Sequence, residues 1–555
     1  MRTAPSLPLQ FSTLPALFHL LMLHLLLVVQ ASPPGPVVLC QSGNTNCTLT
    51  NAYGAFPDRS TCHVTAVSYP STEEELLRAV SDAAVKRHRV KVVTVYSHSI
   101  PKLSCPAGPD GRPGLLISTQ RLNRTVSTDA YGARMTFEAG ITLRSLLDAA
   151  AARGMALPHS PYWEGVTLGG LLSTGSHGSS AVGKGSAVHE YVVGMRLVVP
   201  SAVPSADGYY AKIVSLGEHH PDLLAAKVSL GVLGVISQVT LQLEPMFKRS
   251  VTNRVVSDAT FEQSISSFAA TTPYGDIIWY PSQAIVVYRD DFKLPVTAKG
   301  KGRNDFIGFR PQPTFFIASA RAAGSCLRVN PELTCLRSAE DGLVTACGWD
   351  PRFEGLFYHQ TAVSIPFANI TDFVADVKKL RDANSGALCG PDLYFGFLMR
   401  FVRNSTAYLG KTEDAVDVDI TYYRARDPRQ ARLHEEVLEE IEQMALFKYR
   451  GLPHWGKNRN VGFIGMKDKL GARLQKFLRV MRRYDGEGLF SSEWTDAVLG
   501  LRGKEVVVEG NGCALEGLCI CSRDEHCAPE QGYYCGEGQV YRQARVCRKI
   551  TEDSG

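Results

Sequence analysis

The alternation of apolar and polar positions in the first part of the chain predicts an α/β arrangement. Val64–Val67 has the pattern of a short strand, and Ser71–Glu74 has the pattern of a capping box that opens a helix. Apolar residues recur at helical spacing behind this box, and the run Val90–Val95 then predicts a buried strand. The order strand–helix–strand indicates a βαβ unit that ends close to His98.

The same periodicities continue to a break near residue 245. They predict strands at 115–118, 124–127 and 134–138, a helix from Thr142 to Arg153, a strand at 191–199, a helix at 222–230 and a strand at 235–243. Glu244-Pro245 stops the last of these strands, because proline cannot donate to a sheet ladder. We therefore expect a domain boundary at residue 245.

Beyond this boundary the pattern mixes the two periods. Strands are predicted at 277–280, 284–288 and 416–422, a helix at 431–446, and a further α/β piece at 446–505. The last 50 residues contain six cysteines, and so short a segment cannot build a large apolar core. The cysteines do not form two CxxC pairs, which disfavours zinc, so we expect a disulfide-stapled tail whose pairing stays open. No metal site is predicted.

The N-terminus has the pattern of a secretory signal peptide over residues 1–31. Arg2 supplies the positive end, 14–29 the apolar core, and Val29-Gln30-Ala31 the cleavage site. An uncleaved anchor is the alternative, but His19 and His24 interrupt a run that is already short for a bilayer span. Secretion agrees with the 14 cysteines, and with four glycosylation sequons at Asn46, Asn123, Asn369 and Asn404. We expect an extracellular protein without a stable membrane span after signal cleavage.

Composition and charge serve mainly to exclude one class of function, the binding of nucleic acid. A chain of 555 residues with 45% hydrophobic and 20% charged residues is globular and long enough for several domains. Its formal net charge of +5 is small for this length, and no basic stripe is interleaved with aromatic residues. The sequence therefore predicts no nucleic-acid partner.

One segment carries the strongest chemical signal. Gly165–Ser180 holds five glycines interleaved with hydroxyl residues, a composition that makes a poor helix or strand but lets backbone N–H groups approach a pyrophosphate or a flat ring. Upstream, Tyr96–Ser99 carries a second histidine among small residues. Together the two segments favour a nucleotide-cofactor site. An NAD site is disfavoured, because no G-x-G-x-x-G joins a strand to a helix.

Several motifs occur in a fixed order. They are the βαβ unit ending in a His-Ser pair, Phe137–Gly140, Gly169–Gly178, Leu230–Ile236, and Pro453-His454-Trp455-Gly456-Lys457. In this order the chain resembles the sugar- or aldonolactone-oxidising flavoproteins of the vanillyl-alcohol-oxidase superfamily, and most of all the secreted plant type similar to L-gulonolactone oxidase. The resemblance covers residues 55–500, and the Cys-rich tail is similar to an extension of the plant members.

The resemblance implies an α+β fold and its division. A PCMH-type FAD-binding domain of two subdomains would occupy 56–245, an α/β substrate cap 246–445, a return segment 446–505 and the disulfide tail 506–555. The implied cofactor is FAD, bound covalently through His98 with Ser97 and Ser99 as donors. Animal relatives carry a run of glycines where this chain has Val95-Tyr96-Ser97, and the larger side chains narrow the space for the pyrophosphate.

The resemblance also implies residues that hold the dinucleotide. Those expected beneath it are Gly169, Gly170, Ser173, Thr174, Gly175, His177 and Gly178. The glycines would give backbone access, the hydroxyls would bind phosphate or ribose, and His177 would lie near the ring. Val235 and Ile236 would line the adenine side.

For catalysis the resemblance implies three side chains. His454 would accept the proton of the substrate C2 hydroxyl, Lys457 would hold a ring oxygen or stabilise charge on the flavin, and Arg400 would anchor the substrate. Leu398 replaces the glutamate of a Glu-x-Arg pair found in several relatives. Pro161 stands where family oxidases carry glycine and the corresponding dehydrogenase alanine, at a gate for oxygen.

The sequence therefore predicts a secreted FAD-dependent oxidoreductase whose partners are a small sugar lactone and O2. The expected reaction is oxidation of L-gulono-1,4-lactone to L-ascorbate with formation of H2O2. One alternative is a flavoenzyme on the same scaffold that oxidises another polyol, an oligosaccharide or a cytokinin-like amine. Another is a secreted glycoprotein with a non-catalytic flavin fold, in which the Cys-rich tail is the working part.

Overall fold

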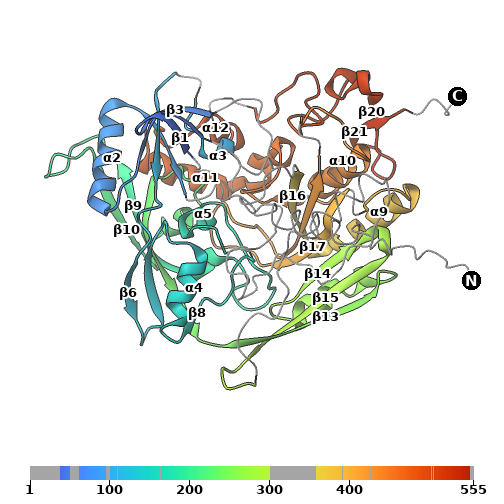
Figure 1. Cartoon of the computed structure of the whole chain (residues 1–555), viewed down its shortest axis with the longest axis horizontal. Coiled ribbons are helices and arrows are strands. Elements are labelled where there is room, and N and C mark those ends of the chain that lie inside the picture. Colours follow the sequence, from blue (N-terminus) through green and yellow to red (C-terminus); the bar gives the residue numbers. More distant parts are fainter. Residues whose placement is uncertain are drawn as a thin grey trace, which may run out of the picture.

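Two halves, each built on β-sheet, lie side by side with the short helix α5 (Leu168–Ser173) between them (Figure 1). The computed structural model describes residues 38–49, 62–94, 101–108, 111–162, 164–299, 358–389, 392–424, 427–501, 503 and 505–550. The predicted signal segment and the residues Ser97, His98 and Ser99 lie outside these ranges.

The first sheet contains the predicted βαβ unit. Its strands run in the order β1 (Val38–Ser42), β2 (Thr45–Leu49), β3 (Cys62–Ser68), β5 (Gly114–Ser118) and β4 (Arg89–Val93), with β3 and β4 both parallel to β5. Helix α2 (Glu73–Lys86) crosses between β3 and β4. The predicted capping box was one residue out of place. Thr72 is the N-cap and accepts the Glu75 N–H at 3.1 Å, while the Glu75 carboxylate accepts from Ser71.

The second sheet is antiparallel and contains the four predicted strands together with β10 (Ala211–Gly217), which was not predicted. Its order is β10, β9 (Val192–Pro200), β11 (Val235–Gln242), β7 (Arg134–Glu138) and β6 (Thr125–Asp129). Helix α4 (Leu143–Ala151) has the predicted cap, Thr142, whose hydroxyl accepts the Ser145 N–H. The predicted helix at 222–230 shortens to α6 (Leu223–Ala226). A two-stranded pair, β8 (Met155–Ala156) with β12 (Glu244–Pro245), ends this half.

The Gly-rich segment differs from the expectation of a poor helix. Residues Leu168–Ser173 form α5, and the Thr167 hydroxyl caps it by accepting the Gly170 N–H. Leu168, Leu171 and Leu172 are fully buried. Tertiary packing of these three leucines therefore outweighs the cost of two glycines, about 1 kcal/mol each, in the helix interior.

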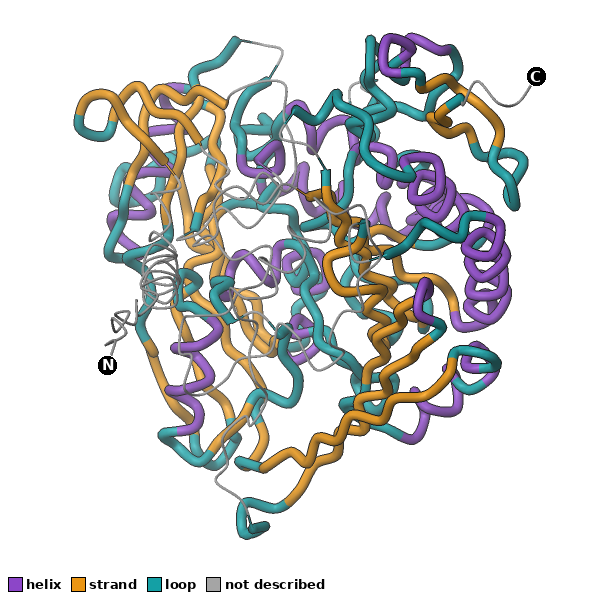
Figure 2. The backbone as a smooth tube through the Cα atoms, turned by 45° about the vertical axis from the view of Figure 1, so that its right-hand side comes forward, coloured by secondary structure: helices purple, strands orange, loops and turns teal. Residues whose placement is uncertain are grey.

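A seven-stranded antiparallel sheet forms the other half. Its order is β13 (Lys248–Ser257), β15 (Ile285–Leu294), β14 (Asp276–Tyr280), β17 (Leu393–Val402), β18 (Ala415–Tyr423), β16 (Tyr358–Pro366) and β19 (Leu452–Pro453). Helices α7 (Ile265–Thr271), α9 (Phe367–Ala383) and α10 (Glu435–Gln443) cover its outer face and share one apolar core with it (Figure 2). The predicted helix at 431–446 begins later, at Glu435, and continues as one π-helical turn over Met444–Lys448.

The chain then returns to the first half. Helix α11 (Met466–Tyr484) packs in the large core that also contains residues of β7, β9 and β11, and α12 (Glu493–Val498) joins it there. The inner face of the seven-stranded sheet faces this core, through Ile278, Val287 and Leu398. The site described below lies where the two halves meet.

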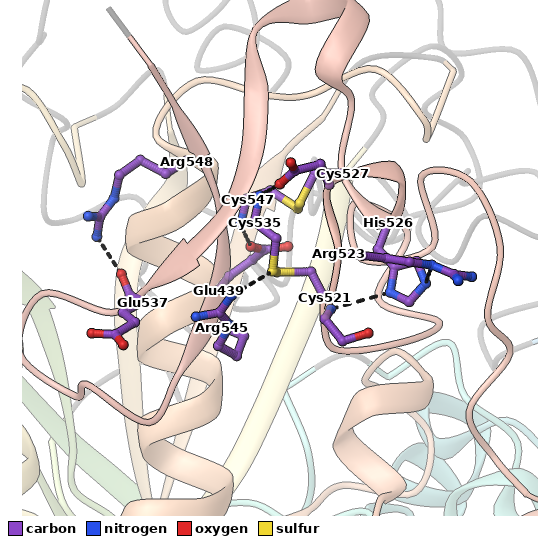
Figure 3. Close-up of a disulfide and its surroundings, with 12 residues drawn as sticks. Glu439, Cys521, Arg523, His526, Cys527, Cys535, Glu537, Arg545, Cys547 and Arg548 are labelled. Atoms are coloured by element: carbon purple, nitrogen blue, oxygen red, sulfur yellow. Dashed lines mark hydrogen bonds between the residues drawn. A yellow bond between two sulfur atoms is a disulfide. The ribbon is translucent and has the colours of Figure 1, made fainter. Parts of the chain in front are cut away.

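The tail folds on top of α10. Strands β20 (Tyr533–Glu537) and β21 (Arg545–Lys549) pair, and β21 lies against α10. Three disulfides join Cys513 to Cys519, Cys521 to Cys535 and Cys527 to Cys547, so the predicted disulfide tail is confirmed. Figure 3 shows the second and third of these. Across the described ranges, no helix has the length and apolar character needed to span a bilayer.

Candidate active site

Backbone segments converge around the Gly-rich segment, and glycines make this possible. A Cβ on Gly140 would lie 1.8 Å from the Thr119 carbonyl oxygen, and one on Gly178 would lie 2.6 Å from the Ser160 carbonyl oxygen. A Cβ on Gly169 would meet the Ala139 carbonyl oxygen at 3.2 Å. Only glycine therefore permits this close packing at Gly140 and Gly178.

The hydroxyls of this segment are engaged within α5. Ser173 Oγ donates to the Gly169 carbonyl at 2.8 Å, and Thr174 Oγ1 donates to the Gly170 carbonyl at 3.1 Å. Their hydrogens are used in this way, so the two hydroxyl oxygens can accept from a ribose O–H but have no hydrogen left to donate to a phosphate oxygen. Of the two expected ligands, phosphate or ribose, these hydrogen bonds therefore favour ribose.

The residues expected on the adenine side are apolar core residues of β11. Val235 is fully buried against Leu76 and Val198, so its side chain lies in the core and not at a ligand surface. Ile236 is nearly buried in the larger core. Pairing with β9 turns the Val235 side chain into the protein interior, and its place on the adenine side stays a prediction.

Strand pairing places Arg400 in a buried cluster of charges. In the antiparallel register of β17 and β18, Leu398 lies opposite Asp419 and Arg400 opposite Asp417, so these side chains share the inner face of the sheet. Arg400 Nη2 donates to Asp417 Oδ2 at 3.0 Å and to Asp419 Oδ2 at 3.2 Å. Asp419 thus supplies a carboxylate directly across from the position where Leu398 lacks one.

Two lysines complete the charged cluster. Lys457 Nζ donates to Asp419 Oδ2, and Lys411 Nζ lies 4.0 Å from Asp417 Oδ1. Lys411 also donates to the Pro453 carbonyl at 3.2 Å. Within this charged cluster, defined as Arg400, Lys411, Asp417, Asp419 and Lys457, three cations face two carboxylates. The cluster therefore carries one net positive charge when every member is ionised.

Burial and the neighbouring charges set the protonation of this cluster. Burial by itself raises the pKa of Asp417, but His177, Arg400 and Lys411 more than offset it and hold the pKa well below its usual range. Burial lowers the pKa of Lys411 to about 8, and burial likewise lowers the pKa of Lys457. The lysines are therefore easier to deprotonate than lysines in water.

His177 and His454 lie together beside the charged cluster, with ring centroids 5.6 Å apart. Burial lowers the pKa of both, and the nearby Lys457 lowers that of His454 further, so both rings are neutral at pH 7. The hydrogen bonds then set the tautomers. His177 Nδ1 donates to the Gly178 carbonyl at 2.9 Å, whereas His454 Nδ1 accepts the Gly456 N–H at 3.1 Å.

The two histidines therefore offer opposite functions at their Nε2 atoms. Nε2 of His454 carries a hydrogen that it can donate, whereas Nε2 of His177 has a lone pair that can accept. His177 Nε2 is buried, lies 3.4 Å from Asp417 Oδ2 without hydrogen-bond geometry, and has no hydrogen-bond partner among the residues that the structure describes. A buried acceptor without a donor indicates a place for a ligand O–H or N–H.

A small cavity of about 20 Å³ lies at the same place. Its walls come from the Gly-rich segment, from β17 and the loop after it, and from the His454 turn; they include Thr174, His177, Leu409, Lys411, His454 and Trp455. Trp455 holds the turn by donating to the Leu409 carbonyl at 2.6 Å and by stacking on Phe463. Gly456 packs against Thr174, where a Cβ would lie 3.3 Å from the threonine side chain.

Further polar side chains lie beside the charged cluster, around Tyr162, which follows Pro161 in the sequence. Arg289 donates to the Tyr162 hydroxyl at 2.6 Å, and this hydroxyl donates to buried Asp276. The Tyr162 ring also lies 6.0 Å from Arg400 Cζ. The two chain neighbours of Pro161 are Ser160, which packs against Gly178, and Tyr162, which lies near Arg400.

Four residues of the site were not predicted from the sequence: Lys411, Asp417, Asp419 and Tyr162. A signal for the two aspartates was present, because Val416-Asp417-Val418-Asp419-Ile420 alternates acidic and β-branched residues in a predicted strand. Acidic residues two positions apart on a strand lie on the same face of the sheet. In this protein both faces of that sheet are covered by an apolar core. Lys411 and Tyr162 lie in loops, where no periodicity marks them.

Comparison with known proteins places the chain in a family. Three protein-family models match the chain. The FAD binding domain matches residues 64–202, and the D-arabinono-1,4-lactone oxidase family matches residues 356–498. The C-terminal domain of L-gulonolactone oxidase 2-like proteins matches residues 510–549. The chain is 47% identical to L-gulonolactone oxidase 2 of Arabidopsis thaliana, with 98% of each chain covered. The chain belongs to the L-gulonolactone oxidase family.

Other relatives agree with this assignment. L-gulonolactone oxidase 5 of Arabidopsis thaliana is 47% identical, over 94% of this chain and 95% of the relative. Among solved structures, cholesterol oxidase from B. sterolicum is similar in fold, with a TM-score of 0.62 at 16% identity, covering 84% of this chain and all of that one. The predicted family and α+β flavoprotein fold are confirmed.

The described residues fit the FAD that this family uses. The glycines at 140, 169 and 178 pack against the Thr119, Ala139 and Ser160 carbonyls, so they serve the packing of the backbone around the site. The unpartnered His177 Nε2 suits a ligand that donates a hydrogen bond. Gly170 adds a link to the first sheet, since a Cβ there would lie 3.6 Å from the side chain of Thr94. FAD is the cofactor of this family, and the His177 Nε2 atom offers a bound ligand a hydrogen-bond acceptor.

Proposed function

We propose that the protein oxidises an aldonolactone, specifically L-gulono-1,4-lactone to L-ascorbate, with FAD as cofactor and O2 as the final acceptor of two electrons and two protons, giving H2O2. The observation that supports this most is the charged cluster beside a neutral histidine pair. A lactone is uncharged and rich in hydroxyls, so it suits a site with several buried donors, one net positive charge and an unpartnered acceptor.

Each side chain has a role in this proposal. FAD, when bound, supplies the hydride acceptor. Arg400 and Lys457 hold the oxygens of the lactone and stabilise the negative charge that develops when its hydroxyl loses a proton. His177 Nε2 accepts that proton, and His454 donates from Nε2–H to a substrate oxygen, which revises the expected role of His454 as the base.

We also infer that the flavin is held by the loop after β4, covalently through His98 with Ser97 and Ser99 as neighbours. Supporting this, Thr94 at the start of that loop packs beside Gly170 of α5. At four further residues we expect the backbone to lie close to the dinucleotide: Gly169, Gly170, Gly175 and Gly178. Gly175 is in the left-handed region at a φ of 68°, which suits glycine at the end of α5.

The test of the function uses the purified, disulfide-intact full chain. After acid precipitation, yellow colour that stays with the pellet supports a covalent flavin, and peptide mapping should locate it on His98. Anaerobic addition of L-gulono-1,4-lactone should then bleach the flavin, and air should yield H2O2. A colourless protein would overturn the flavoenzyme proposal, whereas activity only on a polyol, an oligosaccharide or a cytokinin would overturn the substrate.

We further propose that the protein acts outside the cell. The tail disulfides and the pairs Cys40–Cys47 and Cys62–Cys105 support an oxidising compartment. Three sequon asparagines, Asn46, Asn123 and Asn404, are exposed, whereas Asn369 is half-buried and its side-chain amide donates to the carbonyl of the distant Tyr449 at 3.1 Å. Glycan analysis of the secreted protein should therefore find Asn369 the least modified of the four.

The histidine roles predict an unequal effect of glutamine substitution. Glutamine can still donate a hydrogen bond but cannot act as a base, so His454→Gln should retain at least about a tenth of kcat, whereas His177→Gln should lose about 100-fold. Stopped-flow reduction of the flavin by the lactone measures both. A larger loss in H454Q than in H177Q would return the role of proton acceptor to His454.

The lowered pKa of Lys411 predicts an alkaline limit to activity. As the pH rises through about 8, Lys411 loses the positive charge that balances Asp417, so kcat/KM should fall above that pH. Arginine stays charged, so in Lys411→Arg the fall of kcat/KM should move to higher pH. Lys469 has a similarly lowered pKa, also about 8, but donates to the Leu446 and Gly451 carbonyls, so Lys469→Arg is the matched control that should leave the fall of kcat/KM at the same pH.

A further inference from the structure

The turn that carries His454 and Lys457 is held from behind by the Cys-rich tail. Immediately after this turn, Arg459 Nη1 donates to the Leu515 carbonyl at 3.1 Å, and the Val461 N–H donates to the Gly517 carbonyl at 3.0 Å. Both acceptors lie in a loop of seven residues, 513–519, that the Cys513–Cys519 disulfide closes. The tail thus contacts the chain two residues beyond Lys457.

The closed loop is shaped to receive Arg459. Gly517 has a φ of 63°, and a Cβ there would lie 2.4 Å from Arg459 Nε, so the arginine side chain lies directly over this glycine. The loop is buried and internally bonded, since the Leu518 N–H donates to the Cys513 carbonyl at 2.8 Å and the Gly517 N–H to the Ala514 carbonyl at 2.7 Å. Its two carbonyls therefore have fixed positions.

Arg459 also ties the turn to α10. Its Nη2 donates to Glu442 of α10, and both side chains are almost fully buried. Glu442 accepts in addition from Thr361 of β16 at 3.1 Å. On the site side, Asn458 bonds to β16, where its side chain donates to the Ala362 carbonyl at 2.9 Å and accepts the Ala362 N–H at 3.0 Å.

The tail itself is anchored on α10 through buried carboxylates that accept its backbone N–H groups. Glu439 accepts the Cys547 N–H at 2.6 Å, and Glu440 accepts the N–H groups of Gln539, Val540 and Tyr541, each at 2.7 Å. Figure 3 shows Glu439 beside the disulfides of Cys547 and Cys535. Four backbone N–H groups of the tail are bonded to α10 in this way, so the tail is a rigid support and not a loose extension.

We propose that the disulfide-closed loop 513–519 is a working part of the active site, and that Arg459 is a positioning residue through which this loop sets the place of Lys457 and His454. The kinetic part of this inference rests on the proposed lactone oxidation, whereas its structural part does not. A displacement of a catalytic group by about 1 Å can cost about 100-fold in rate, so even slight loosening of the turn would be measurable.

The test compares two double variants of the full chain, Cys513→Ala with Cys519→Ala, and Cys521→Ala with Cys535→Ala. The second is the matched control, because the hydrogen bonds described for Cys521 and Cys535 stay within the tail. Hydrogen–deuterium exchange of the peptide 452–463 should become about 10-fold faster in the first variant and stay within about 2-fold of wild type in the control. Flavin content should be unchanged in both.

The kinetic readout is kcat/KM for the lactone, expected to fall about 10-fold in C513A/C519A, with little change in C521A/C535A. Arg459→Lys serves as a second variant if the first does not accumulate, since it keeps the charge facing Glu442 but lacks the planar fork. Wild-type exchange of 452–463 in either informative variant would overturn the inference. Wild-type protein without lactone activity would overturn the proposed function only, because the exchange comparison needs no substrate.

Discussion

Replacement of Lys457 by methionine is expected to lower kcat/KM for the lactone about 1,000-fold while the protein keeps its fold and flavin. Lys457 Nζ is directed at Asp419 in the inner layer of the sheet, beside the His454 turn. Removal of one preorganised charge donor of this kind from a dry site costs about 100- to 1,000-fold in rate. Asp419 keeps Arg400 at 3.2 Å and Gln360 at 3.1 Å, so the variant should fold.

Steady-state kinetics with a flavin titration by absorbance measures this effect. Lys448→Met is a suitable control, because Lys448 also pairs with a buried aspartate, Asp376, but on the outer side of the sheet. It should keep wild-type kcat/KM. If K457M retains more than about a tenth of the wild-type kcat/KM, Lys457 has no part in stabilising the developing charge.

Replacement of Arg400 by methionine should lower the free energy of unfolding by about 3–5 kcal/mol, in addition to weakening substrate binding. Arg400 is the shared partner of Asp417 and Asp419, which are both buried. Without it, two carboxylates remain in a water-poor layer with Lys411, Lys457 and neutral histidines around them. The loss comes from carboxylates left without a full set of partners.

Urea denaturation followed by fluorescence measures the shift of the midpoint. Arg254→Met is the control, since Arg254 pairs with Asp290 at 3.0 Å in an exposed position and should change stability by less than about 1 kcal/mol. The double variant R400M/D417N should recover part of the loss. The deficit of R400M should also shrink as the pH falls, because protonation removes the uncompensated carboxylate charge. A midpoint equal to wild type would show that the lysines alone satisfy both aspartates.

Strand periodicity predicted much of the scaffold because it is a local property. The strands at β7, β9, β11 and β18, and the Thr142 cap of α4, follow from alternation and capping chemistry within a few residues. Local rules failed where long-range packing decides the outcome. The glycines of α5 are poor helix formers, yet three leucines packed in the core hold the helix in place.

The site shows the same division. The motif His454-Trp455-Gly456-Lys457, the arginine at 400 and the Gly-rich segment could be found in the sequence, because each is a short pattern with distinctive chemistry. The opposite roles of the two histidines could not. They depend on whether Nδ1 donates to the Gly178 carbonyl or accepts the Gly456 N–H, and both bonds follow from the final course of the backbone.

The sequence by itself therefore determined the family, the kinds of element and a set of reactive residues, since residue type and spacing encode these directly. Only the tertiary structure decided which of them meet. The register of β17 against β18 places Asp419 across from Leu398 and Asp417 across from Arg400, and it gathers two lysines around them. The physical reason is that burial and the partner charges, which set pKa values and hydrogen-bond roles, exist only once distant strands have paired.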